Sequence, residues 1–303
     1  MRSLNLDHLM TLAAIAECGS FSAAARQLNL TQPAVSLQVR ELEQRYGVKL
    51  IDRLGKKVFP TDAGRQLLAH QARIASEVDA ALATLRRLRD GGLGRLRFAT
   101  GSSTLAYRLL PQLKHLRQAH PTLELVCTTG FADETVQAVR DNKTDLALVT
   151  LPIDGTGLVV RPALRDPLVL VIARSDTALA KALPQRPRAT DIARLPFLVE
   201  SHKSGASRLI EAWFQRNGVR LKPAMELGSV EAVRNAIIAG LGVSILPIEV
   251  TFDHAGEDFV TRTLSPPLTR ELALIYRPEK AEDPALKVLC EAIEALGDLV
   301  VPN

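Results

Sequence analysis

The 303-residue sequence predicts an α/β protein with three successive parts. Three short helical patterns and two short strands occupy residues 1–61, and one long amphipathic pattern follows over residues 62–90. In residues 91–303, strand patterns alternate with helical patterns, which is typical of a sheet with parallel strands covered by helices. The glycine-rich segment Asp90-Gly91-Gly92-Leu93-Gly94 separates the second and third parts.

The first part has the pattern of two helices joined by a short turn. Residues 4–17 carry apolar side chains at helical spacing, and Ser20 is placed to cap the next helix, Phe21–Leu28. After the turn Asn29-Leu30, Thr31 caps a third helix that opens with Thr-Gln-Pro. These features predict a helix-turn-helix, whose second helix enters the major groove of DNA.

The third helix is expected to present its polar face to DNA, because Val35, Val39 and Leu42 form its apolar face. Glutamine side chains suit adenine edges, whereas Thr31 and Arg40 suit phosphate groups. An ordinary solvated helix face is the alternative. The residues predicted to contact DNA from these helices are Ser20, Thr31, Gln32, Pro33, Ala34, Ser36, Leu37, Gln38 and Arg40.

A basic hairpin is predicted next. Lys49–Ile51 and Lys57–Pro60 read as two short strands around the segment Arg53-Leu54-Gly55-Lys56-Lys57. Such a wing can lie on the phosphates beside the groove, so Arg53, Lys56 and Lys57 complete the predicted DNA contacts; a solvated charged turn is the alternative. Residues 1–90 hold 13 Lys and Arg against 9 Asp and Glu, and therefore most of the chain's net charge of +5.

A long helix, about Ala63–Arg89, begins after the capping residues Thr61-Asp62. Its apolar side chains recur at helical spacing along the whole length. A helix of roughly this length, with no neighbour of its own to cover it, is expected to pair with a second copy of the chain.

The third part is predicted to form two α/β lobes. Strands are expected at Leu96–Ala99, Leu123–Thr128, Leu146–Thr150, Leu168–Ala173, Phe197–Glu200, Val243–Leu246 and Leu272–Tyr276. Helices are expected at Ala106–Ala119, Thr135–Asp141, Ser207–Asn217, Val230–Ala239 and Pro284–Leu296. Crossings near Arg161–Pro167 and Leu264–Leu268 would divide lobe I, about residues 91–163 and 268–303, from lobe II, about residues 164–267.

Small polar residues follow several of these strands. Ser102-Ser103-Thr104 opens a helix, where N–H groups and hydroxyls suit an anion, although simple capping is the alternative. Ligands favour the carboxyl ends of strands, so Thr128–Phe131, Thr150 and Glu200–His202 are expected at the same cleft. The predicted ligand-binding residues are Ser102, Ser103, Thr104, Thr129, Gly130, Phe131, Thr150, Ser201, His202, Gly228, Ser229 and Pro247.

Other kinds of function find little support. Cys18, Cys127 and Cys290 lie far apart, so the sequence predicts no disulfide framework, zinc site or redox pair. It contains no nucleophile elbow, GxGxxG or P-loop, and we expect neither an enzyme nor a cofactor or metal. The N-terminus lacks the apolar core of a signal peptide and no apolar run could span a bilayer, so we expect a cytoplasmic protein without membrane contact.

Taken together, these motifs resemble the LysR-type transcriptional regulators over nearly the whole chain. The N-terminal matches are Gly19-Ser20-Phe21, Ala24-Ala25, Leu28, Thr31–Ser36, Leu42-Glu43, Gly47, Leu50, Arg53, Thr61 and Ala63-Gly64. The C-terminal matches are Leu110-Pro111, Pro121, Asp145–Ala147 and Gly240–Pro247. The sequence departs from the family at Leu37, where many members carry an arginine that contacts bases or phosphates.

The resemblance implies a winged helix-turn-helix, a linker helix that mediates dimerisation, and an effector-binding domain with the fold of bilobal solute-binding proteins. It implies a homodimer or homotetramer on a partly palindromic double-stranded promoter site, with RNA polymerase as a further partner. A small-molecule co-inducer, such as an organic acid or an amino acid, would bind between the lobes. The alternatives are a solute-binding protein, for the C-terminal part alone, and an α/β enzyme, which would need a nucleophile or an acid/base pair in the cleft.

Overall fold

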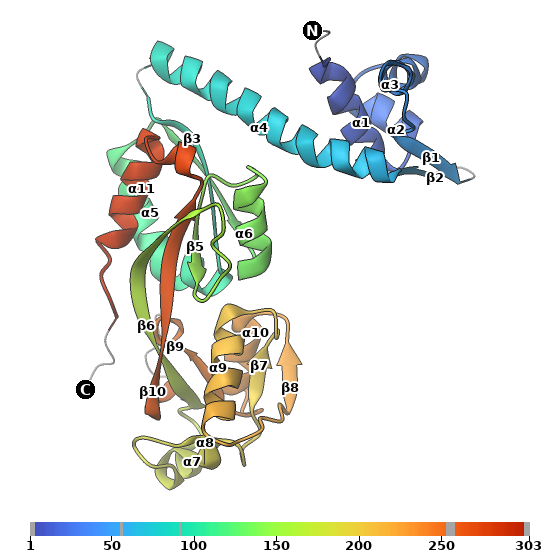
Figure 1. Cartoon of the computed structure of the whole chain (residues 1–303). Coiled ribbons are helices and arrows are strands. Elements are labelled where there is room, and N and C mark those ends of the chain that lie inside the picture. Colours follow the sequence, from blue (N-terminus) through green and yellow to red (C-terminus); the bar gives the residue numbers. More distant parts are fainter. Residues whose placement is uncertain (1–3, 55–56, 91, 253–257, 300–303) are drawn as a thin grey trace. The chain divides into compact units, whose positions relative to one another are not determined.

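The computed structural model describes residues 4–54, 57–90, 92–252 and 258–299 (Figure 1). The chain forms two compact units: residues 1–85 with 141–143, and residues 86–140 with 144–303. The boundary between the two units thus falls inside the long helix, between Leu85 and Arg86. The sequence places a domain boundary at the end of that helix. The domain boundaries predicted from the sequence therefore stay predictions. No helix within the described ranges is long and apolar enough to cross a membrane.

The first unit contains three helices and a two-stranded hairpin, followed by the start of a long helix. Its elements are α1 (Leu6–Cys18), α2 (Phe21–Gln27), α3 (Gln32–Tyr46), β1 (Ile51–Leu54), β2 (Lys57–Pro60) and α4 (Asp62–Asp90). The predicted caps are confirmed, because Ser20 and Thr31 accept hydrogen bonds from the helix N–H groups they precede. Leu12, Ile15 and Leu42 lie at the centre of the core.

The hairpin begins later than the sequence predicts, at Ile51 rather than Lys49. The backbone before it is held by other partners: Glu43 of α3 accepts hydrogen bonds from the N–H groups of Leu50 and Ile51, at 2.9 and 3.3 Å. The carbonyl of Lys49 accepts one from the Thr61 hydroxyl at 2.7 Å. These contacts fix the base of the hairpin on α3 and α4.

The second unit is built on one mixed six-stranded sheet, with strand order β4-β3-β5-β10-β6-β9. Its strands are β3 (Gly94–Thr100), β4 (Leu123–Thr129), β5 (Leu146–Thr150), β6 (Val159–Ala173), β9 (Ser244–Pro247) and β10 (Phe259–Tyr276). A separate parallel pair is formed by β7 (Leu198–Glu200) and β8 (Met225–Leu227). The expectation of parallel strands holds for β3 with β4 and β5, but β10 runs antiparallel to both of its neighbours.

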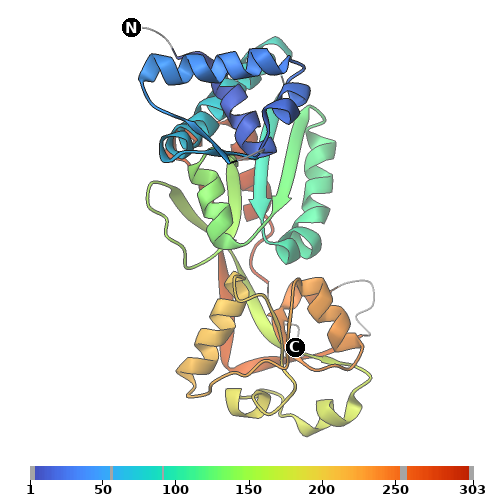
Figure 2. The same cartoon turned by 90° about the vertical axis from the view of Figure 1, so that its right-hand side faces the viewer.

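The two predicted crossings between the lobes lie within long strands. β6 and β10 pair over most of their length and run through both lobes (Figures 1 and 2). Residues 161–167 contain two prolines and three charged side chains, which hide the alternation of a strand. Residues 264–268 fall where the register shifts between Thr263 and Leu268.

Helices cover both faces of the sheet in each lobe. In lobe I, α5 (Leu110–Ala119) and α11 (Pro284–Glu294) cover one face through Leu116 and Leu289, while α6 (Ala132–Arg140) covers the other. In lobe II, α9 (Gly205–Arg216) and α10 (Val230–Ile238) take these positions. The remaining helical elements are η1 (Thr104–Leu109), α7 (Thr177–Ala182), α8 (Ala189–Ile192), η2 (Ile248–Thr251) and η3 (Pro278–Lys280).

Candidate functional site

The outer face of α3 is the candidate nucleic-acid surface. Val35 and Val39 are buried, so the helix can turn Gln32 and Arg40, both exposed, away from the core. Leu37 is also exposed, at 52%. The helix therefore presents most of the residues that the sequence assigns to DNA.

Gln38 differs from its predicted orientation. It is half-buried, and its side-chain oxygen accepts a hydrogen bond from the hydroxyl of Thr11 on α1. The side chain thus helps to join α1 to α3 through its oxygen, and its amide nitrogen takes no part in this bond. Its contact with DNA stays a prediction, as does that of Ser20, whose hydroxyl caps α2 at 3.4 Å from the Ala23 nitrogen.

The hairpin is positioned by a half-buried carboxylate, that of Glu43. Burial alone raises the pKa of Glu43, but its bonds to Lys49, Leu50 and Ile51 outweigh burial and hold the pKa below its usual value. Glu43 is consequently an anion at neutral pH and links β1 to α3, the helix proposed to contact DNA. Lys56 lies outside the described residues, as do the side chains of Arg53 and Lys57, so their predicted phosphate contacts stay predictions.

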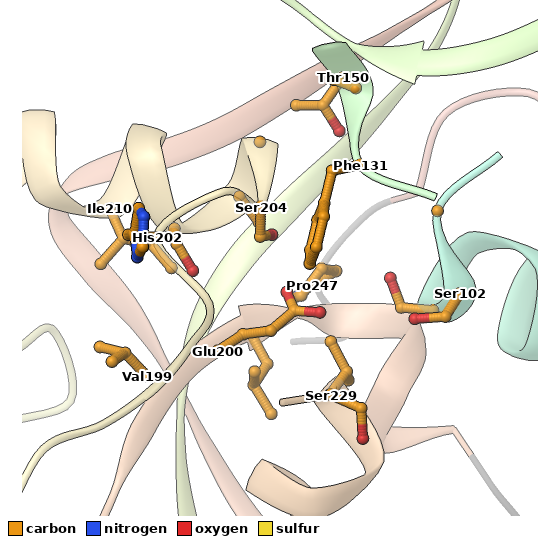
Figure 3. A pocket seen from close by; sticks show the side chains of 18 of the residues that line it. Ser102, Phe131, Thr150, Val199, Glu200, His202, Ser204, Ile210, Ser229 and Pro247 are labelled. Carbon is orange, nitrogen blue, oxygen red and sulfur yellow. The ribbon is translucent and has the colours of Figure 1, made fainter. Parts of the chain in front are cut away.

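A cavity of about 550 Å³ lies in the second unit and is the candidate ligand site (Figure 3). Residues from the ends of β3, β4, β5, β7 and β9 line it, together with the first turns of α9 and α10. The fold brings together, along the wall of this cavity, all of the ligand-binding residues predicted from the sequence except Ser201.

Ser201 is the correction to that set. It is half-buried but does not line the cavity, whereas Glu200 before it and His202 after it both do. Ser201 follows β7 directly and His202 already belongs to a turn, so strand alternation does not explain the difference. Among the lining residues that the sequence analysis did not assign are Ser204 and Arg270. Arg270 lies between the predicted crossing at residues 264–268 and the predicted strand at residues 272–276, and the sequence gives no indication that its side chain is buried.

The helix that follows β3 opens in a way the sequence does not predict. Residues Thr104–Leu109 form a π-helical turn before α5 begins. Thr104 is buried, and its hydroxyl accepts a hydrogen bond from Arg270 at 3.3 Å. Ser103 makes no side-chain capping bond, so capping does not account for this pair of hydroxyl residues.

Behind the cavity wall lies a buried group of four charged side chains: Arg108, Asp166, Glu249 and Arg270. Asp166 is within 3.1 Å of both guanidinium groups, and Arg270 also pairs with Glu249. Two cations and two anions therefore compensate one another away from water, which is the condition under which buried charges are tolerated. The group ties η1 and η2 to the two long strands.

Two of the three cysteines are poorly suited to redox chemistry. Cys127 and Cys290 are free, and burial raises the pKa of each thiol, that of Cys290 to about 11. A raised pKa disfavours the reactive thiolate. Among the described residues, moreover, no group of three or more metal-binding side chains comes together.

Comparison with known proteins matches two domains of the chain to one family. Residues 6–65 match the model of the bacterial regulatory helix-turn-helix protein, lysR family, and residues 89–297 match the LysR substrate binding domain. The chain is 30% identical over 248 residues to the HTH-type transcriptional activator CmpR of Synechocystis, covering 82% of this chain and 80% of that protein. It is 31% identical to a RuBisCO operon transcriptional regulator of Allochromatium vinosum, covering 93% of each chain.

The fold is also that of solved regulators. Full-length CbnR in complex with its target DNA superimposes with a TM-score of 0.73 at 22% identity, covering 97% of this chain and 100% of that one. The relatives are regulators rather than enzymes. The helix-turn-helix and the substrate-binding domain occur in the same order and span nearly the whole sequence. The chain therefore belongs to the LysR family of DNA-binding transcriptional regulators.

Proposed function

We propose that this regulator recognises a promoter through α3 and the β1–β2 hairpin and is controlled by a small-molecule co-inducer bound in the cavity between the lobes. The observation that supports ligand control is that five strands end at one cavity, and that small polar residues line it at the ends of β3, β4 and β5. Its volume suits a metabolite, since ligand pockets commonly enclose about 300–1,000 Å³. Residues 1–61, 62–90 and 91–303 then act as DNA-binding, linker and effector-binding parts.

The linker helix supports self-association. Val78, Leu82 and Leu85 are 38%, 44% and 63% exposed and lie four and three residues apart on α4. That spacing places them on one stripe of the helix, as in a coiled-coil seam. We further propose a homodimer or homotetramer that binds partly palindromic DNA in the cytoplasm, with RNA polymerase as the partner in transcription.

The mechanism couples these parts. A ligand that binds the two lobes better in one relative orientation shifts the population toward that orientation. Through the paired linker helices, the shift changes the spacing of two DNA-binding domains and hence the bend of the promoter. The protein's own residues perform no chemistry on the ligand in this scheme.

The residues proposed at DNA are separable by experiment. Gln32→Ala is expected to weaken binding to a selected operator by roughly tenfold while leaving random duplex unaffected, because a base contact is worth about 1–3 kcal/mol. Lys56→Ala is expected to weaken both duplexes alike and to reduce the slope of affinity against salt by about one unit. Fluorescence anisotropy on both duplexes measures this, and equal losses for the two variants would contradict the assigned roles.

The proposed ligand site is testable by filling it. Ser102 lines the cavity, and Ser102→Trp is expected to abolish the thermal stabilisation that a binding metabolite gives the intact protein. A panel of organic acids, amino acids, aromatic acids and phosphorylated sugars supplies the ligands. Lys114→Trp on the exposed face of α5 is the matched control. A metabolite that stabilises the Ser102 variant as well as the parent protein would show that the effector binds elsewhere.

A further inference from the structure

The side chain of Glu200 is an unexplained feature of the cavity. It stands at the end of β7, is half-buried, and directs its carboxylate into the cavity toward Phe131 and Pro247 (Figure 3). It hydrogen-bonds with Ser204, a buried residue at the start of α9. Over the ranges that the structure describes, no lysine, arginine or histidine lies within ion-pair distance of this carboxylate.

The positive side chains that line the cavity already have partners. Arg270 is 3% exposed and is held by Asp166, Glu249 and Thr104. Its Nε has no hydrogen-bond partner, but that atom is buried. His202 lies 3.2 Å from Glu226, on the exposed rim of the cavity. A bound anion would thus find no uncompensated cation along the described wall.

The surroundings of Glu200 disfavour its charge. Burial raises its pKa, and the nearby carboxylate of Glu231 raises it further, whereas the Ser204 hydroxyl and Arg270 act in the opposite direction. A carboxylate that is desolvated without a cation is unfavourable in the empty protein. A positively charged group in the cavity would supply the missing partner and reverse that penalty on binding.

We propose that the co-inducer carries a positively charged nitrogen, an amine or a guanidine, that pairs with Glu200. The inference rests on the proposed function of the cavity and narrows its ligands from all small polar metabolites to amino acids, polyamines and guanidino compounds. Glu200 is then the residue that selects for charge: dicarboxylates and sugar phosphates, which would approach it with negative groups, are rejected by repulsion.

The test uses probes matched in shape and different in charge. The intact protein is titrated by calorimetry and by thermal shift with ω-amino acids, diamines, guanidino acids and the standard amino acids. Each ω-amino acid is paired with the alkanoate that replaces its ammonium by methyl and with the dicarboxylate that replaces it by carboxylate; 4-aminobutyrate, pentanoate and glutarate are one such set. We expect at least one cationic probe to bind roughly ten- to hundredfold more tightly than its matched analogues, as a charge-assisted hydrogen bond allows.

The Glu200→Gln variant tests whether the ligand preference depends on the negative charge of Glu200 or only on its hydrogen bonding. Glutamine keeps the size and the hydrogen-bonding capacity of the neutral carboxyl but cannot be an anion. It is expected to remove the preference for the cationic probe, and binding by the parent protein should strengthen as pH rises through the raised pKa of Glu200. Glu282→Gln, an exposed position away from the cavity, controls for loss of one charge.

The same variant has a readout without any ligand. Because the pKa of Glu200 is raised in the folded state, folding favours its protonated form, and stability is lost as pH rises through that pKa. Glu200→Gln should therefore melt at a higher temperature than the parent protein at pH 7.5, and this difference should vanish near pH 4. Such a gain accompanied by loss of ligand binding is typical of a functional charge.

Four outcomes would overturn the inference. The dicarboxylates could bind more tightly than the cationic probes, or Glu200→Gln could leave the selectivity unchanged. A cationic probe could bind the Ser102→Trp variant as tightly as the parent protein, or no cationic probe could bind at all. The first two leave the proposed function intact where Ser102→Trp still abolishes binding. A metabolite effect on DNA binding that survives Ser102→Trp overturns the proposed function itself. Failure of the charge assignment and failure of the cavity as the effector site are thus distinguishable.

Discussion

Replacing Asp166 by alanine is expected to destabilise the second unit by about 3–5 kcal/mol, because removing one partner of a buried ion pair leaves an uncompensated charge. Asp166 is fully buried and bridges two guanidinium groups, with 3.1 Å from its oxygens to Arg108 and to Arg270. Without it, only Glu249 faces two buried cations. A unit of this size loses roughly 2–4 °C of melting temperature per kcal/mol, so the transition should fall by roughly 6–20 °C.

Thermal and urea unfolding of the intact protein measure this change. Glu282→Ala is the matched control, because Glu282 is 88% exposed in its ion pair with Lys287, and exposed pairs contribute at most about 1 kcal/mol. Asp166→Asn keeps one acceptor and should fall between the parent protein and the alanine variant. If Asp166→Ala is as stable as the Glu282→Ala control, the four buried charges do not compensate one another in solution as their geometry indicates.

These buried charges also mark where sequence reasoning ends. Arg108, Asp166, Glu249 and Arg270 come from four distant segments, and charged residues are normally read as surface. Nothing local indicates that they meet. For the same reason, the charged and proline-containing residues 161–167 do not read as a strand, whereas the sheet register makes them part of β6.

Local signals, by contrast, were sufficient for the helices of the first unit. The Ser20 and Thr31 caps and the spacing of Val35, Val39 and Leu42 define α2 and α3 without tertiary information, and the structure confirms them. The cavity was predictable because hydroxyl residues and glycines after strand ends converge in an open sheet. The direction of a side chain was not: Gln38 turns toward Thr11, and Ser201, expected at the cleft, does not line the cavity.

The second large effect is expected at Gly64, a residue of the family signature whose role the sequence does not explain. It lies in the first turn of α4, and its N–H donates to the hydroxyl of Thr61 at 3.0 Å. A Cβ at this position would overlap the backbone carbonyl of Leu50, and it would lie 3.2 Å from Pro60. That carbonyl is itself fixed, since it accepts a hydrogen bond from the Thr61 nitrogen at 3.0 Å.

Gly64→Ala sets two effects against each other. Alanine favours a helix over glycine by about 1 kcal/mol, whereas overpacking a well-packed contact costs about 1–3 kcal/mol and sometimes more. Here the obstacle is backbone, which no change of rotamer relieves, so α4 must move away from the hairpin base and the net effect should be a loss of about 2 kcal/mol. In a unit of this size that lowers the first unfolding transition by roughly 8–16 °C.

The displacement should also reach DNA, because the base of the hairpin is held jointly by α4 and by Glu43 of α3. Affinity for random duplex is therefore expected to fall along with stability, even below the melting temperature. Ser22→Ala, at an exposed position of α2, provides the same final residue without a collision and should leave the transition within about 0.5 kcal/mol of the parent protein. A Gly64→Ala variant that is as stable as this control would mean that helix propensity prevails, and that the close approach of α4 to Leu50 is not what requires glycine.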